Sequence, residues 1–187
     1  MRPLFAGIGA FEFGNCAVTL LILRATELLQ PDHGKDRATT IALALYVTYN
    51  TAATITSLAA GRHSDRTNAT RVLIVGVAAF GIAYIGFTHD TTNWHVLLPW
   101  FVLAGIGIGC VETAEHTAVA THAPADIRGS AFGLLAATQS FGNLAASLVA
   151  GVLWTAFSPS SAFAYLTFAM AIAFVILTIS APQPAAA

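Results

Sequence analysis

The sequence predicts an all-α integral membrane protein with six transmembrane helices in a single domain, residues 1–187. Apolar residues make up 56% of the chain and charged residues only 9%, whereas a soluble domain carries about 25% charged residues. The 59 residues from 129 to 187 contain no Asp, Glu, Lys, Arg or His. The apolar stretches lack the two-residue alternation of membrane β-strands, so we expect helices.

The six expected helices are the stretches long enough to cross the hydrocarbon core, which takes roughly 20 residues. They cover residues 3–23, 39–60, 72–88, 96–120, 130–154 and 162–180. The first begins after Arg2 and ends before Arg24. We interpret it as a true span and not as a signal peptide, because Glu12 interrupts it and no persuasive cleavage site follows.

The boundaries of the other helices follow from the polar residues between them. The second helix lies between Arg37 and the charged stretch 61–66, and 24 successive positions there, 38–61, carry no charge. The third is short and ends before Asp90. The fourth contains carboxylates near its lower end, whereas the fifth and sixth are uncharged and separate around Ser158.

The Lys and Arg residues of the loops set the orientation. With both termini in the cytoplasm, the inner side carries five of these residues and the outer side three. The inner set is Arg2, Arg62, Arg66, Arg71 and Arg128, and the outer set is Arg24, Lys35 and Arg37. We therefore expect a multi-pass protein of the cell membrane with both termini cytoplasmic.

The six segments differ in polarity in an order that occurs twice. The first and fourth contain carboxylates, the second and fifth carry milder polar residues at helical spacing, and the third and sixth are almost wholly apolar. This order is typical of a three-plus-three internal repeat whose first helices line a cavity. The polar residues of the second and fifth segments, candidates for binding substrate or a neighbouring helix, include Tyr46, Asn50, Gln139 and Asn143.

Carboxylates inside the membrane are the candidate chemistry. Glu112, Glu115 and His116 are spaced so that one helical face presents all three, and Glu12 is followed at i+3 by Asn15. Charges at the bilayer centre cost about 2.5–3.5 kcal/mol on insertion scales, so they normally face a cavity or a partner. A carboxyl there can exchange a proton, with histidine as a relay. The alternative is that Glu115 and His116 are hydrated and inert at the cytoplasmic rim.

No metal or cofactor is expected, because a metal site would need further ligands beyond Glu and His. A Lys- and Arg-rich patch for nucleic acid is also lacking at a net charge of −1. The fifth segment contains small residues four apart, which let helices touch in lipid. We expect helix packing at Arg128, Gly129, Gly133 and Gly151.

Three motifs resemble the C-terminal six-helix half of the major facilitator superfamily of transporters. Gly61-xxx-Asp65-Arg66 with Arg71 resembles the cytoplasmic loop motif between the second and third helices of each half. This chain has Asn68-Ala69-Thr70 where the family has a glycine and two basic residues, so that match is partial. A second motif consists of Glu112 followed by Pro124-xxx-Arg128-Gly129-xx-Phe132-Gly133. It resembles the tenth and eleventh helices of bacterial members. Gly14-Asn15 and Leu21-Ile22-Leu23-Arg24-Ala25 resemble the seventh helix.

The resemblance implies a secondary transporter of a small molecule, with the lipid bilayer as surroundings and proton linkage through the carboxylates. Family members have twelve helices, so the implied partner is an N-terminal six-helix half or a second copy. In the loop motif, Gly61 would let helix ends approach, Asp65 would cap the next helix and the arginines would form a breakable latch; a plain turn is the alternative. A non-catalytic or decayed membrane fragment remains an alternative function. A small six-helix membrane enzyme is another, although no Gly-x-Ser-Gly or His-Glu-x-x-His signature is present.

Overall fold

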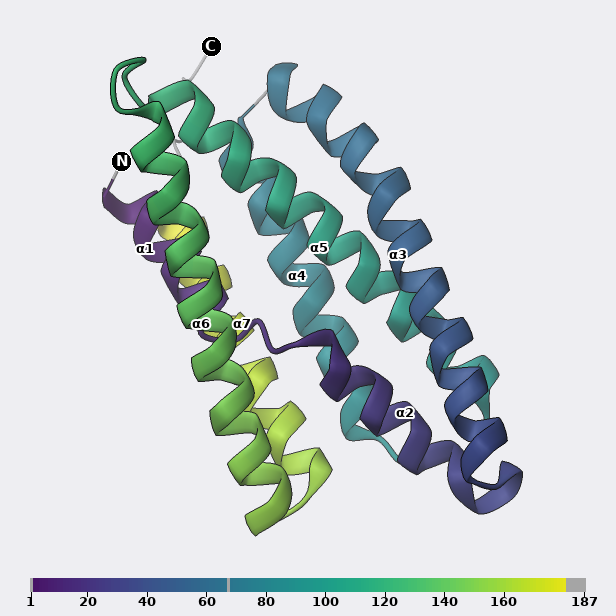
Figure 1. The fold of residues 1–187 in the computed structure, drawn as a ribbon. Coiled ribbons are helices and arrows are strands. Elements are labelled where there is room, and N and C mark those ends of the chain that lie inside the picture. Colours follow the sequence, from purple (N-terminus) through teal and green to yellow (C-terminus); the bar gives the residue numbers. More distant parts are fainter. Residues whose placement is uncertain (1, 67, 181–187) are drawn as a thin grey trace.

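The computed structural model describes residues 2–66 and 68–180, and all regular structure in these ranges is helical. Figure 1 shows the bundle in chain order. Its helices are α1 (Arg2–Glu12), α2 (Val18–His33), α3 (Lys35–Arg66), α4 (Ala69–Thr88), α5 (Trp94–His122), α6 (Arg128–Ala156) and α7 (Pro159–Ser180). Helices α3 to α7 are each long and apolar enough to cross a membrane. Each contains one of the second to sixth predicted spans.

The first predicted span, 3–23, is wrong as a single helix. It consists of α1, with 11 residues, and the start of α2, with 16 residues, separated by a non-helical stretch at 13–17. At 1.5 Å per residue α1 is about 17 Å long and α2 about 24 Å, so neither crosses about 30 Å of hydrocarbon alone. Most of the expected loop at 24–38 is also helical. The chain turns from α2 into α3 at Gly34, whose φ of 74° favours glycine.

The charged motif at 61–66 does not form a loop. It is the last part of α3, and α4 begins at Ala69 after Asn68, whose Oδ1 accepts a hydrogen bond of 2.8 Å from the Thr70 N–H. Asn68 therefore caps α4 in place of the expected Asp65. A Cβ at Gly61 would meet only Thr113, at the ordinary distance of 3.8 Å, so the expected close approach is not made there.

The other members of this motif can be placed only in part. Arg71 is exposed in the first turn of α4. The side chains of Asp65 and Arg66 lie outside the described part of the structure. The latch expected from this motif therefore stays a prediction.

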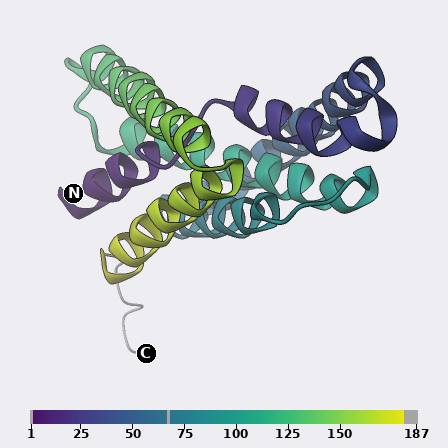
Figure 2. The same cartoon turned by 90° about the horizontal axis from the view of Figure 1, so that it is seen from below.

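Helix α5 is the centre of the larger part of the bundle, where it packs along both α3 and α4. A Cβ at Gly105 or Gly109 would collide with backbone carbonyls of α3, and one at Gly107 with Phe80 of α4. These small residues thus bring three helices into backbone contact, as is common in lipid. Helix α2 packs on α3, and α7 joins α4 to the pair α1 and α6. Seen from below, α6 and α7 diverge from α2 and α3 (Figure 2).

The glycines expected to pack α6 do not do so within this chain. A Cβ at Gly129, Gly133 or Gly151 would meet nothing within 4 Å, and Arg128 is exposed at the first residue of the helix. A different glycine, Gly142, makes the close contact of α6, as described below.

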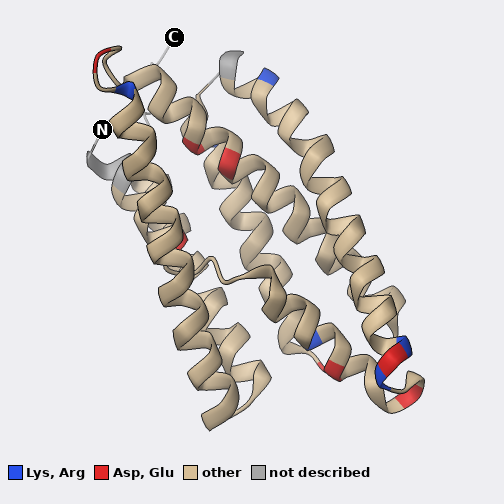
Figure 3. Ribbon diagram, in the orientation of Figure 1, with Lys and Arg blue, Asp and Glu red and all other residues tan. Residues whose placement is uncertain are grey.

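Lys, Arg, Asp and Glu residues gather mainly at the two ends of the bundle, near the α2–α3 corner and the α5–α6 loop (Figure 3). Helix α1 begins and α7 ends at the end that carries the α5–α6 loop (Figure 1). A chain that starts and ends at the same end of a bundle passes along it an even number of times, and this holds here when α1 and α2 are counted together as one passage. A few acidic residues lie away from both ends, and they define the candidate site.

Candidate functional site

The break between α1 and α2 is held by side chains of other helices. Backbone groups in hydrocarbon need hydrogen-bond partners, so a non-helical stretch survives only where protein or a water-filled cavity supplies them. Asn143 Nδ2 of α6 donates to the Asn15 carbonyl at 2.9 Å, and Ser147 Oγ accepts from the Ala17 N–H at 2.8 Å. Tyr165 of α7 donates its hydroxyl to the Phe13 carbonyl at 3.1 Å. The break is therefore a built part of the fold.

Gly142 lets α6 reach the end of α1. A Cβ at this position would lie 2.5 Å from the Cβ of Glu12 and 2.9 Å from its carbonyl carbon. Real Cβ atoms do not approach other atoms so closely, and the backbone of Glu12 cannot move aside as a flexible side chain could. Only glycine fits here without a shift, so Gly142 fixes the distance between α6 and the break.

A polar hollow opens where α1 ends between α5 and α6. It has a volume of about 420 Å³ and is lined by Glu12, Asn15, Ile108, Glu112, Gln139, Ser140 and Asn143. This volume lies in the range of small-molecule sites, about 300–1,000 Å³. Glu12 is only 2% exposed and accepts a hydrogen bond of 3.2 Å from Asn15 Nδ2. Five residues that the sequence singled out thus meet in one place.

Glu115 lies behind this hollow. Its side chain is fully buried, and Oε2 accepts a hydrogen bond of 2.7 Å from Gln139 Nε2. Its Oε1 has no hydrogen-bond partner among the described residues. The carboxyls of Glu12, Glu112 and Glu115 interact electrostatically with one another. A proton or cation that neutralises one of them would relieve the repulsion, which is strong in a medium of low polarity.

Three other candidate residues are not part of the hollow. His116 is exposed, its Nδ1 is 2.7 Å from the Glu112 carbonyl, and its ring stacks on Phe132. Asn50 is exposed and donates to the Tyr46 carbonyl of its own helix. Tyr46 stacks on Tyr49 along α3. No cluster of three or more potential metal ligands occurs in the ranges 2–66 and 68–180.

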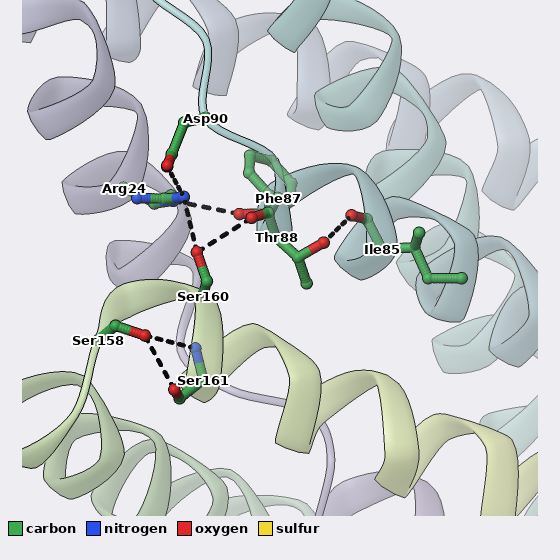
Figure 4. Close-up of polar contacts among 8 residues, drawn as sticks. All are labelled: Arg24, Ile85, Phe87, Thr88, Asp90, Ser158, Ser160 and Ser161. Carbon is green, nitrogen blue, oxygen red and sulfur yellow. Dashed lines mark hydrogen bonds and ion pairs between the residues drawn. The ribbon is translucent and has the colours of Figure 1, made fainter.

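Arg24 has a role that the sequence did not reveal. It was expected in an outer loop, but it is 4% exposed within α2. Figure 4 shows its contacts. Arg24 Nε donates to the Phe87 carbonyl at 3.1 Å, and Nη2 reaches Asp90 Oδ1 at 2.8 Å and Ser160 Oγ at 3.4 Å. Ser160 Oγ in turn donates to the Thr88 carbonyl at 3.0 Å. Arg24 and Ser160 therefore cap the carbonyl end of α4 from α2 and α7.

The residues Arg24, Ser147 and Gly142 differ in how clearly the sequence indicates their roles. Arg24 lies between the apolar runs Leu20–Leu23 and Leu28–Leu29, a pattern that indicates a partly buried cation on a helix. Ser147 was not missed, because it lies at the same helical spacing as Gln139 and Asn143 and belongs to the polar face expected of the fifth segment. Nothing in the sequence distinguishes Gly142 from the other glycines of α6, because its role depends on where α1 ends.

Comparison with known proteins agrees with this architecture. The family model of the Major Facilitator Superfamily matches residues 7–187. An uncharacterized MFS-type transporter of Methanocaldococcus jannaschii is 34% identical over 163 residues, which is 87% of this chain and 40% of that protein. The chain thus spans about two fifths of the length of this curated relative. It is a multi-pass membrane protein that belongs to the Major Facilitator Superfamily of transporters.

Proposed function

We propose that this chain forms the six-helix half of a secondary active transporter, which moves a small molecule across the cell membrane in exchange for, or together with, protons. The observation that carries the proposal is the polar hollow beside the break between α1 and α2. Discontinuous helices near the bilayer midplane are where many transporters bind substrate and coupling ions. Here the break places Glu12 and Asn15 at the hollow.

Proton linkage is the part of the proposal that rests on the carboxyls. A protonated carboxyl crosses an apolar barrier at far lower cost than an ionised one, so its titration is linked to the inward–outward equilibrium. Glu12 and Glu112 both line the hollow. The side chain of Glu12 is almost completely buried, whereas that of Glu112 is exposed. Glu12 is the first candidate for the coupling residue and Glu112 the second.

The surfaces of α3 and α6 support a partner. In the most apolar, membrane-length stretch of each helix, only 11% of α3 and 17% of α6 is buried in this chain, whereas 61% of α4 is buried. Helix α3 also carries the exposed polar side chain of Asn50, which lipid would not solvate. We propose that a further six-helix half or a second copy covers both helices. The three-plus-three repeat and cytoplasmic termini belong to the same proposal.

The experiment uses proteoliposomes that contain the protein and an internal pH-sensitive dye. A panel of amines, sugars and carboxylic acids is added as probes, with and without an imposed pH gradient. We expect at least one probe to move protons in a protein-dependent way. Glu12→Gln keeps the shape of the side chain but removes its proton, so it should abolish the response to the gradient and leave exchange of the labelled probe partly intact.

The matched control is Glu27→Gln, which changes an exposed glutamate of α2 away from the polar hollow. It should behave as the wild type does. If Glu12→Gln still responds fully to the gradient, Glu12 is not the coupling residue. If no probe moves protons, proton-linked transport by copies of this chain alone is contradicted, which leaves a further six-helix half as the required partner or the non-catalytic fragment.

A further inference from the structure

We infer that the polar hollow selects a positively charged substrate, an amine or quaternary ammonium compound. This inference rests on the proposed transport function, because it names the substrate class of the same site. Three features of the hollow support it: the sign of its charged side chains, the direction of its amides, and the end of the helix that faces it.

The charged groups of the hollow have one sign. Glu12 and Glu112 line it, Glu115 lies behind Gln139, and no Lys, Arg or His is among the described residues that line it. A substrate anion would lie against these carboxyls with no cation in the lining to compensate, since His116, which acts electrostatically on Glu112, is exposed outside the hollow. Such a juxtaposition costs several kcal/mol. A cation would instead offset the repulsion between the carboxyls. Glu115 is fully buried and does not line the hollow, so it acts on a substrate there through its charge and not as a hydrogen-bond acceptor.

The three amides of the hollow turn their nitrogens toward the protein. Asn15 donates to Glu12, Gln139 donates to Glu115, and Asn143 donates to the Asn15 carbonyl. Each of these partners is a carboxyl or carbonyl oxygen, so the amide nitrogen is the atom that must face it. The oxygen of each amide is then the end directed away from that partner. Acceptors in this arrangement suit a substrate that brings N–H donors or a diffuse positive charge.

The end of α1 at the break contributes an electrostatic field of the same sign as that of the carboxylates. Helix α1 ends at Glu12, and the carbonyl end of a helix carries a partial negative charge of roughly half an electron. The opposite end of the break, the start of α2, would favour an anion. The residues at the start of α2, Ala17 and Val18, do not line the hollow, however, whereas Glu12 at the end of α1 does. The carbonyl end of α1 and the carboxyls therefore act together on a cation.

The test reads the charge preference of the hollow without needing the natural substrate. Ser140, which lines the hollow and is exposed, is replaced in a chain whose buried Cys16 and Cys110 are changed to Ala. The Ser140→Cys chain in an uncharged detergent is treated with a trimethylammonium-ethyl or a sulfonato-ethyl methanethiosulfonate. The ratio of the two reaction rates is compared with the same ratio for 2-mercaptoethanol.

We expect the ratio of cationic to anionic rates at Ser140→Cys to exceed the solution ratio by about tenfold or more, the scale on which charged clefts concentrate ligands. Adding Glu12→Gln or Glu112→Gln should lower the ratio toward the solution value, whereas Glu27→Gln should not. Circular dichroism and gel filtration check that each variant is folded.

A ratio at or below the solution value would overturn the inference, as would a high ratio that neither Gln substitution lowers. Failure of both reagents to react would also overturn it, because an ammonium group could then not enter the hollow. The readout involves no transport. Absence of proton-linked flux in proteoliposomes would therefore contradict the proposed function and leave the rate ratio at Ser140→Cys unchanged. A rate ratio at the solution value would overturn the charge preference and leave the flux unchanged.

Discussion

Replacing Arg24 should destabilise the bundle far more than removing its ionic partner. The Phe87 carbonyl is in the last turn of α4, where no later N–H of the helix can reach it, and Arg24 Nε is its donor. Leaving a buried acceptor unbonded costs about 1–3 kcal/mol. The ion pair with Asp90 adds about 0–1 kcal/mol, because the Asp90 side chain is 82% exposed. Arg24→Met, which keeps much of the length of the side chain, should therefore cost about 1–4 kcal/mol.

The assay is unfolding in mixed micelles of lipid and SDS, followed by circular dichroism at 222 nm. Asp90→Asn is the matched control and should cost no more than about 1 kcal/mol. Arg24→Lys keeps the charge but lacks the fork of donors that reaches three acceptors, so we expect an intermediate loss. The reasoning is refuted if Asp90→Asn is as harmful as Arg24→Met, because the ion pair would then dominate over the cap.

Two further outcomes follow from the fold. Gly142→Ala should lower the free energy of unfolding in the same assay by about 1–3 kcal/mol, because the new methyl group meets the backbone of Glu12. Gly133→Ala, with open space around it, should raise this free energy by up to about 1 kcal/mol, because alanine is the better helix former. An equal effect of both would remove the special role of Gly142. For topology, a membrane-impermeant thiol reagent should label Arg62→Cys only from the cytoplasm and Thr92→Cys only from outside. Both positions are exposed, and labelling of Arg62→Cys from outside would invert the orientation.

Composition and charge predicted the membrane class and five of the helices, because a soluble protein could not keep such long uncharged runs away from water. Five of the residues that line the hollow are also among those singled out from the sequence. Glu12, Asn15, Glu112, Gln139 and Asn143 were chosen because polar groups at membrane depth need a cavity or a partner, and the structure brings all five together.

The break in the first segment could not be predicted in this way. Apart from Glu12 and Asn15, residues 3–23 are as apolar as a continuous span, and hydropathy carries no information about helix continuity. The break depends on bonds from Asn143, Ser147 and Tyr165, which are 128 to 152 residues away in the chain. Gly61 shows the opposite error, since a motif that suggested a loop is the end of a long helix.

The distance in sequence between the break and its partners has a consequence for biogenesis. Ribosomes add about 5–20 residues per second, so the 130 residues from Ala17 to Ser147 take roughly 7 to 26 s to synthesise. During that interval the nascent first segment has none of the donors and acceptors that later hold residues 13–17. It must then either remain a continuous helix or keep these backbone groups in contact with water or the translocon. The hydrogen bonds that hold the break therefore form only after α6 and α7 have been inserted, and conditions that delay these two helices should leave the first segment exposed to quality-control proteases.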